Sequence, residues 1–429
     1  VGIGTGGGAS GLTRSFPVAH GEVISPGDVV SLMDGQIKKG FGVQVGIGTV
    51  FMDGAMGGGG NAWKKKVLMA ALSPSKFVVI MGSATGSSQA LVGSVSGSRS
   101  EFKGGRAPFG PSKLEHFVMA PMSERTFAVA YPDPSNNQVG TLVVGEMVPS
   151  LGVPGFCAPV TFTKDVAARS VAVASLSASV LVLAYNQQAF AGSGHGHGRL
   201  ALAFYANKKV TIGEAADVIP PEADGSKVAS TSDGYTLATL TPERFVLAYR
   251  NLKSKNVGVR IGNVVRGKGA DSLDTAALSV EATISSEGKV LTYLTVAAMS
   301  STRIAVVYAD GGQGSVVIGD VSGGSISLGQ PVRFTGTKPL SVAASPLNSA
   351  SFAVTYYTNN PWRAVVLIGD CYEGEEGPTA HLSESVLSSA YSTHTQVAGL
   401  GGSSFLAAFY DGANGDAGTV VVGQIGMSA

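Results

Sequence analysis

Charge is the property that this sequence has least of. Lys, Arg, Asp and Glu make up 14% of the 429 residues, against roughly 25% in a typical soluble domain. The formal net charge is +1, and the only dense basic cluster is the run of three lysines at residues 64–66. Proteins that bind nucleic acid usually present a strongly basic surface. Nucleic acid is therefore not an expected partner.

Long apolar runs are also missing. No segment approaches the roughly 18 apolar residues that a membrane-spanning helix needs, so we expect no membrane span. The chain starts at Val1 without a methionine, which is consistent with removal of a leader. Because a surface with few charges favours association or residence in a matrix, we expect an extracellular or cell-surface protein; an ordinary neutral surface rich in Ser, Thr and Gly is the alternative.

Cysteine and tryptophan are scarce. Cys157 and Cys371 are the only cysteines and fall in distant parts of the chain, so we expect two free, buried thiols. Trp63 and Trp362 are the only tryptophans. Pyranose rings stack on such side chains, so a repeated set of sugar sites is not expected. No Asn-x-Ser/Thr sequon occurs, so any glycosylation would be O-linked.

Glycine and short apolar runs are what the sequence has in abundance. It contains 60 glycines, and 44% of its residues are hydrophobic. This composition fits either a low-complexity chain or a strand-rich fold. The apolar residues fall in short runs bounded by Gly, Asn, Asp and Pro, which is typical of strands separated by turns. The pattern favours an all-β fold.

A repeat runs along most of the chain. Each copy has a Ser-containing turn, an aliphatic strand that usually ends in Tyr, a polar loop, and a second aliphatic strand that contains Gly. The first residues of the seven aliphatic strands are Phe77, Phe127, Val180, Phe245, Ile304, Phe352 and Phe405, spaced 48 to 65 residues apart. A period of about 50 residues holding four strands is typical of one propeller blade. We therefore predict a single seven-bladed β-propeller over residues 1–429.

The two ends of the chain are predicted to close the ring. Few residues follow the last aliphatic strand, whereas strand-like pieces occur between Glu22 and Ile37. We expect the Gly-rich segment 1–60 to supply the outer strand of the last blade, since that pairing removes the open edges.

The repeat resembles the seven-bladed β-propeller superfamily over nearly the whole chain. The Trp-Asp dipeptide, the aspartate box of sialidase-like enzymes and the full Asp series of integrin-like Ca²⁺ loops do not occur, and the double glycine of kelch repeats does not recur from repeat to repeat. The resemblance therefore implies an architecture and no particular activity.

Two loops contain possible metal ligands. His195 and His197 flank a glycine in one loop, and imidazole pairs bind Zn²⁺ when further ligands are held nearby. Asp411, Asn414 and Asp416 form a short run of oxygen ligands suited to Ca²⁺. A mobile loop and a tight hairpin turn are the competing interpretations, since Asp and Asn favour such turns. No other cofactor is expected.

Catalysis has no local signature. Propeller active sites assemble from several blades, so the sequence leaves an enzyme open without indicating one. We expect a non-enzymatic structural or interaction protein that forms homo-oligomers or polymers, with a glycan or matrix partner as a further possibility. A carbohydrate-active enzyme or lectin at one end of the channel is the alternative, and a peptide-binding scaffold is the third.

Overall fold

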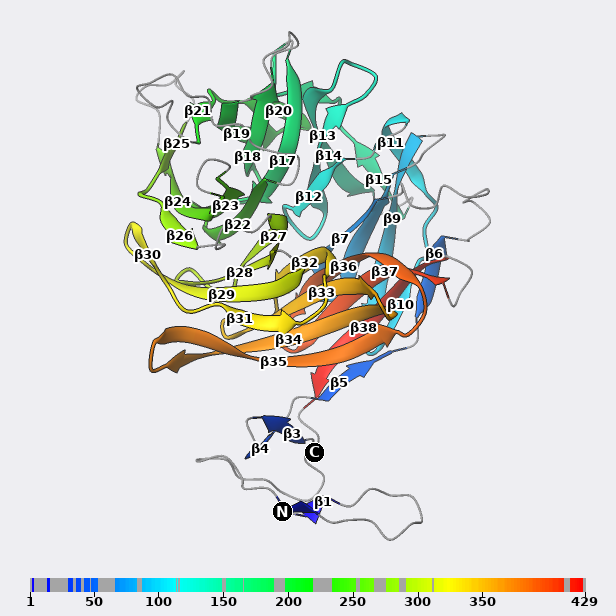
Figure 1. Ribbon diagram of the computed structural model, residues 1–429. Helices are drawn as coiled ribbons and strands as arrows, with labels where there is room; N and C mark the ends of the chain where they lie inside the picture. Colours follow the sequence, from blue (N-terminus) through cyan, green and yellow to red (C-terminus); the bar gives the residue numbers. More distant parts are fainter. Residues whose placement is uncertain are drawn as a thin grey trace.

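In the computed structural model, the protein is an all-β propeller (Figure 1). The structure describes residues 2–3, 14–15, 30–33, 36–39, 42–46, 48–52, 66–82, 87–112, 114, 116–148, 152–164, 166–188, 197–218, 234–251, 255–265, 275–284, 291–310, 312–412 and 417–426. Within these ranges there is no helix long and apolar enough to cross a membrane. We number the seven sequence repeats in chain order. Within each repeat, neighbouring strands pair in antiparallel fashion.

The first strand of each repeat lies at the centre of the molecule. These strands are β7 (Val67–Ser73), β12 (Val118–Pro121), β17 (Ala167–Ser175), β22 (Tyr235–Thr241), β27 (Leu291–Ala298), β32 (Leu340–Pro346) and β36 (Ser392–Gly401). Each contacts the next, and β36 contacts β7, so they form a closed ring.

The second strand is the aliphatic strand that the repeat predicted. These strands are β8 (Lys76–Met81), β13 (Thr126–Asp133), β18 (Val180–Gln188), β23 (Arg244–Arg250), β28 (Arg303–Asp310), β33 (Ser351–Asn359) and β37 (Ser404–Asp411). They are almost wholly buried because neighbouring sheets cover both faces. The tyrosines that end them, such as Tyr131 and Tyr249, are buried as predicted.

The third and fourth strands complete each repeat toward the outside. The third strands are β9 (Ser87–Ser96), β14 (Val139–Val148), β19 (His197–Ala206), β24 (Val257–Val265), β29 (Gln313–Ser322), β34 (Trp362–Gly374) and β38 (Ala417–Gly426). In repeats one to five the outer strand is broken in two: β10 (Arg99–Glu101) with β11 (Ala107–Ser112), β15 (Val153–Phe156) with β16 (Val160–Thr161), β20 (Lys209–Ile212) with β21 (Ala216–Asp217), β25 (Thr275–Leu278) with β26 (Ala282–Ile284), and β30 (Ser325–Leu328) with β31 (Val332–Thr335). Repeat six has one unbroken outer strand, β35 (Gly377–Ser388).

The seventh repeat takes its outer strand from the N-terminal part of the chain. β5 (Gly42–Val45) and β6 (Thr49–Met52) pair with β38, and Figure 1 shows blue β5 beside red β38. The closing strands thus lie within the predicted segment 1–60, but the narrower placement in the strand-like pieces at residues 22–37 is wrong. The strands found there, β3 (Val30–Met33) and β4 (Gln36–Lys39), pair with each other. A further pair, β1 (Gly2–Ile3) with β2 (Arg14–Ser15), precedes them.

The sheets do not confirm the predicted count of seven blades. Repeats one, four, five, six and seven form five separate sheets, whereas repeats two and three share one ten-stranded sheet. The two halves of that sheet are joined by a single residue pair, Val139 opposite Ala167.

The hydrophobic core lies between the sheets. Seven buried clusters each combine side chains from two consecutive repeats, including one that joins repeat seven to repeat one. The last of these contains Phe51 of β6 beside Val67 and Phe77. Ring closure therefore rests on apolar packing as well as on strand pairing.

Candidate functional site

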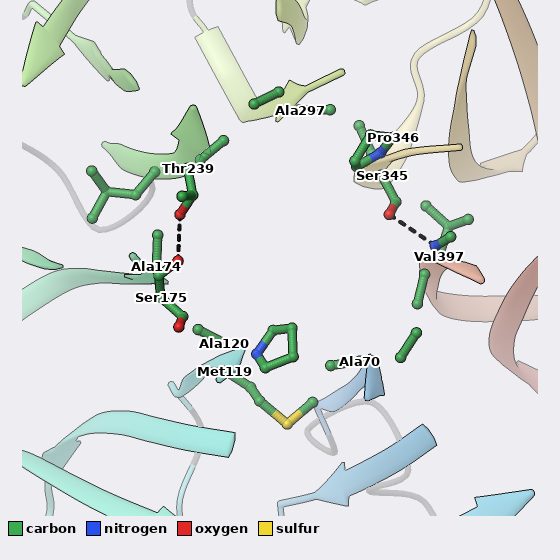
Figure 2. A pocket seen from close by; sticks show the side chains of 18 of the residues that line it. Ala70, Met119, Ala120, Ala174, Ser175, Thr239, Ala297, Ser345, Pro346 and Val397 are labelled. Atoms are coloured by element: carbon green, nitrogen blue, oxygen red, sulfur yellow. Dashed lines mark hydrogen bonds between the residues drawn. The ribbon is translucent and has the colours of Figure 1, made fainter. Parts of the chain in front are cut away.

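A cavity on the axis of the ring is the first candidate site. Its volume is about 480 Å³, and all seven inner strands contribute to its wall. Figure 2 shows side chains reaching the opening from every side. The lining contains Ala, Val, Leu, Met, Pro, Gly, Ser, Thr and Gln and, among the described residues, no ionisable side chain. The wall is neutral and built mainly from small residues.

Hydrogen bonds between neighbouring inner strands use part of the polar lining. Thr239 Oγ1 donates to the Ser175 carbonyl oxygen at 2.6 Å, and the Gly399 amide donates to Ser345 Oγ at 2.9 Å (Figure 2). Thr395 Oγ1 likewise donates to the Ser341 carbonyl oxygen at 2.7 Å. These groups hold adjacent repeats together. The described lining therefore offers apolar contacts and a few hydroxyl groups, but no group that exchanges protons near neutral pH.

The predicted metal ligands fall in and around the segments that join the second and third strands of repeats three and seven. His195, Asn414 and Asp416 lie outside the described residues. His197 begins β19 opposite Gln187. The structure thus brings no predicted ligands together, and its described residues contain no group of three His, Cys, Asp or Glu side chains suited to a metal.

Two acidic residues that end second strands, Asp411 and Asp133, accept hydrogen bonds from serines. Asp411 accepts a hydrogen bond from Ser388 Oγ at 2.9 Å. In the corresponding hairpin of repeat two, the Asp133 carboxylate accepts the Ser135 amide at 2.8 Å and the Ser135 hydroxyl at 2.6 Å. Such contacts are typical of Asx turns. The turn interpretation accounts for Asp133.

His394 lies at a β-bulge in β36, at the same end of the sheet as Asp411. Its backbone has φ +55°, and Nδ1 lies 3.0 Å from Thr393 Oγ1. The ring meets Tyr410 edge-on with centroids 5.6 Å apart. Burial, aided by Lys66, lowers the pKa of His394 to about 4. This imidazole is therefore neutral at physiological pH and is unsuited to exchange protons there.

Both cysteines are free and half-buried. Cys157 Sγ accepts the Val144 amide at 3.2 Å, and Cys371 Sγ lies 3.5 Å from Met299 Sδ. Burial raises the pKa of the Cys371 thiol to about 12. This side chain is a packing residue, since a reactive cysteine needs a lowered pKa.

Two buried tyrosines are tied to the outer strands by carboxylates. Tyr249 donates to Glu281, and Tyr356 donates to Glu384 Oε2 at 2.6 Å. Each carboxylate also lies near an arginine: Arg260 at 3.8 Å from Glu281, and Arg363 at 3.1 Å from Glu384. Burial and the neighbouring carboxylate raise the pKa of each phenol. In each group the arginine balances the charge of the glutamate, and the tyrosine hydrogen bond ties the outer part of the sheet to the second strand.

An aromatic cluster near Asp411 was not found by sequence reasoning. Trp362 lies 6.3 Å from Tyr357 with ring planes 14° apart, and 4.5 Å from Tyr391 at 59°. Trp362 begins β34, Tyr357 lies in β33, and Tyr391 lies between β35 and β36. The sequence signal was Tyr357, which follows the core tyrosine and so points to the opposite side of the strand.

Comparisons with known proteins give the fold and no family. No protein-family model matches the chain, and no curated protein sequence is significantly similar to it. The BP39L lectin from Burkholderia pseudomallei has a similar structure, with a TM-score of 0.53 and 13% identity over 85% of this chain and 97% of the lectin. The Aleuria aurantia lectin, a six-bladed β-propeller, has a TM-score of 0.44 at 13% identity and covers 76% of this chain and 96% of its own. A chain of the COPII outer coat vertex has a TM-score of 0.48 at 13% identity, covering 84% of both chains. The likeness to the first of these shows that this chain has a β-propeller fold.

Proposed function

We propose that the protein is a non-enzymatic, seven-bladed β-propeller that associates with copies of itself outside the cell or at its surface. Seven blades follow if the ten-stranded sheet is divided at its single joining pair, Val139 opposite Ala167. The closed ring of seven inner strands and the seven inter-repeat core clusters support this division. The second and third repeats are then ordinary blades whose edges touch.

The observation that carries the proposal is the position of the exposed large apolar side chains. Every one among the described residues lies on a third strand, on an outer strand, or in the break of an outer strand: Val45, Val50, Val265, Val280, Trp362, Tyr372 and Val386. These strands form the rim of the disc, and we call this set the rim residues. Val280 is 88% exposed and Val386 is 47% exposed. The rim residues belong to repeats four, six and seven. An interaction site is expected where such side chains form a contiguous apolar surface.

The low overall charge of the chain favours contact between two copies. With 14% charged residues and a net charge of +1, two copies repel each other weakly. A contact of ordinary size buries about 800 Å² on each partner. The second copy is thus the partner that this surface fits best.

The neutral axial cavity supports a non-enzymatic role. A carbohydrate-active enzyme working in the channel would need converging carboxylates, and the described lining of the cavity has none. A lectin needs no carboxylates in the channel, because it binds sugar without cleaving it. The aromatic cluster around Trp362, outside the channel, is the feature that favours this alternative.

Sedimentation and light scattering over a concentration series test the proposal. We expect the wild-type mass to rise above 43.3 kDa with concentration, and the variant Val280→Lys with Val386→Lys to remain monomeric, because two charges on the rim oppose apolar contact. Ser301→Lys, which adds one positive charge at an exposed turn between β27 and β28, is the control for the effect of an added lysine away from the rim and should associate like the wild type. A wild-type protein that stays monomeric at every concentration contradicts the proposal.

A further inference from the structure

The aromatic cluster at the loop end of repeats six and seven combines one open ring with several hydroxyl groups. Trp362 is 36% exposed, whereas Tyr357 and Tyr391 are half-buried beside it. The nearly parallel arrangement of Trp362 and Tyr357 holds the indole in a fixed orientation. The cluster therefore has one exposed indole, held between two half-buried tyrosines.

A third phenol lies close to this cluster. Burial raises the pKa of Tyr357 to about 12, and Tyr293 and Tyr391 add to the shift because their hydroxyl groups are nearby. Tyr293 comes from β27 of repeat five, so three consecutive repeats contribute to the cluster. The raised pKa keeps the Tyr357 phenol protonated at neutral pH. A phenol hydroxyl can both donate and accept hydrogen bonds.

The surrounding backbone fixes the cluster in place. The Gly412 amide donates to the Tyr391 carbonyl oxygen at 2.7 Å, which ties the end of β37 to the tyrosine. Ser388, three residues before Tyr391, donates to the Asp411 carboxylate. Asp411, identified in the sequence as a possible metal ligand, thus lies on the segment that borders the aromatic cluster. Thr358 Oγ1 donates to the Pro361 carbonyl oxygen at 2.6 Å and braces the hairpin that contains Trp362.

We propose that Trp362, with Tyr293, Tyr357 and Tyr391, forms a binding site for a pyranose sugar. A pyranose has an apolar C–H face that stacks on an aromatic ring and a rim of hydroxyl groups that need hydrogen-bond partners. One exposed indole bordered by phenol hydroxyls offers both. A methylammonium ligand would instead need rings that enclose it, whereas Trp362 and Tyr357 are nearly parallel. A proline-rich peptide would need an aromatic-lined groove, and this cluster has a single exposed ring.

This inference goes beyond self-association and does not depend on it. The site binds sugar without cleaving it. Trp362 is itself one of the rim residues, and Val386 of β35 pairs with Val365, three residues after Trp362, so the two surfaces are neighbours in repeat six. Sugar binding is read from fluorescence and NMR, whereas association is read from the particle mass. Association of copies and sugar binding can therefore be measured and can fail separately.

Titration with methyl glycosides tests the inference. Trp63 and Trp362 are the only tryptophans, so the variant Trp63→Phe makes the fluorescence report on Trp362 alone. A panel of methyl α- and β-glycosides of glucose, galactose, mannose and fucose is the probe. At least one should change the emission saturably, and Trp362→Ala should weaken its binding, measured by saturation-transfer NMR, about tenfold or more.

Two further variants make the result specific. Tyr391→Phe keeps the ring and removes one hydroxyl, so it should weaken binding severalfold, and its thermal midpoint is measured alongside to confirm folding. Tyr372→Ala removes an exposed aromatic ring at the other end of β34 and should bind like the wild type. No saturable response to any glycoside overturns the inference, as does equal binding by Trp362→Ala, or binding of a proline-rich peptide or tetramethylammonium in place of the glycosides.

Discussion

The cross-strand pair of Phe and Gly is the smallest unit that repeats around the ring. The first core residue of the second strand faces a glycine of the third strand in the pairs Phe77 with Gly93, Phe127 with Gly145, Phe245 with Gly262, Phe352 with Gly369 and Phe405 with Gly423. A Cβ atom at any of these glycines would overlap the phenyl ring. The ring covers the glycine and supplies the packing that the glycine lacks.

Repeat three reverses this pair and so provides a test. Val180 stands in the position of phenylalanine, and Phe204 stands opposite it in the position of glycine. We expect Phe352→Val and Gly369→Phe each to lower the free energy of unfolding by about 2 to 4 kcal/mol, the first through a cavity and the second through overpacking. The double variant should lose clearly less than the sum, because it restores one large and one small side chain. Urea unfolding of the four proteins measures this, and strictly additive losses would show that the two positions do not act as a pair.

His394 should make stability depend on pH. Its pKa is about 4 in the folded protein and about 6.5 in an unfolded chain. As pH falls through this window, the unfolded state takes up a proton that the folded state does not, so stability falls by up to about 3 kcal/mol. Asparagine tolerates the positive φ at this position, so His394→Asn should lose less stability than the wild type between about pH 7 and about pH 4.5 in urea unfolding. The exposed His116→Asn is the control, and an unchanged pH profile in His394→Asn would refute the assignment.

At the scale of the element, the break in the outer strand positions one repeat against the next. Gly46, between β5 and β6, lies against the Ser98 carbonyl of repeat one, and Gly104 and Gly329 lie in the same way against Gly152 and Pro378 of the following repeats. A side chain at these glycines would meet backbone atoms. The break therefore permits neighbouring sheets to approach closely.

This packing predicts that a side chain at Gly46, where the ring closes, lowers the stability of the protein. Gly46→Val should separate repeat seven from repeat one, lower the thermal midpoint by several degrees, and speed proteolysis of the segment containing β5 and β6. Differential scanning calorimetry and limited proteolysis measure both effects. Gly324→Val, at a glycine with no atom within 4 Å of its Cβ position, should leave both unchanged. Equal behaviour of the two variants would exclude a packing role for Gly46.

The second strands can be predicted from the sequence because each is encoded by one continuous apolar run. The broken outer strands and the contacts between repeats cannot be predicted in this way. Seven aliphatic runs and their closing tyrosines gave the second strands directly, since burial on both faces demands continuous apolar sequence. The broken outer strands are short and half-exposed, so their pattern is weak; this is why the closing strands were placed at residues 22–37 in place of residues 42–52. The cluster around Trp362 joins residues of three repeats, and no spacing within one repeat reveals such a contact.

At the scale of the whole molecule, an apolar core at every junction builds a closed ring with a neutral axial cavity, and the outer strands carry both ion pairs and the exposed rim residues. Among the described residues, the large apolar side chains that remain exposed lie on the rim and not along the axis. Because few charges take part, association through the rim should persist when the salt concentration rises. Contacts dominated by ion pairs would weaken under the same change.

Electron microscopy of the native protein at increasing concentration tests the central claim most directly. The account predicts disc-shaped particles with seven blades that touch edge to edge, and a loss of these contacts in the Val280→Lys, Val386→Lys variant. Isolated discs at every concentration, or discs stacked face to face with their rims free, would contradict it.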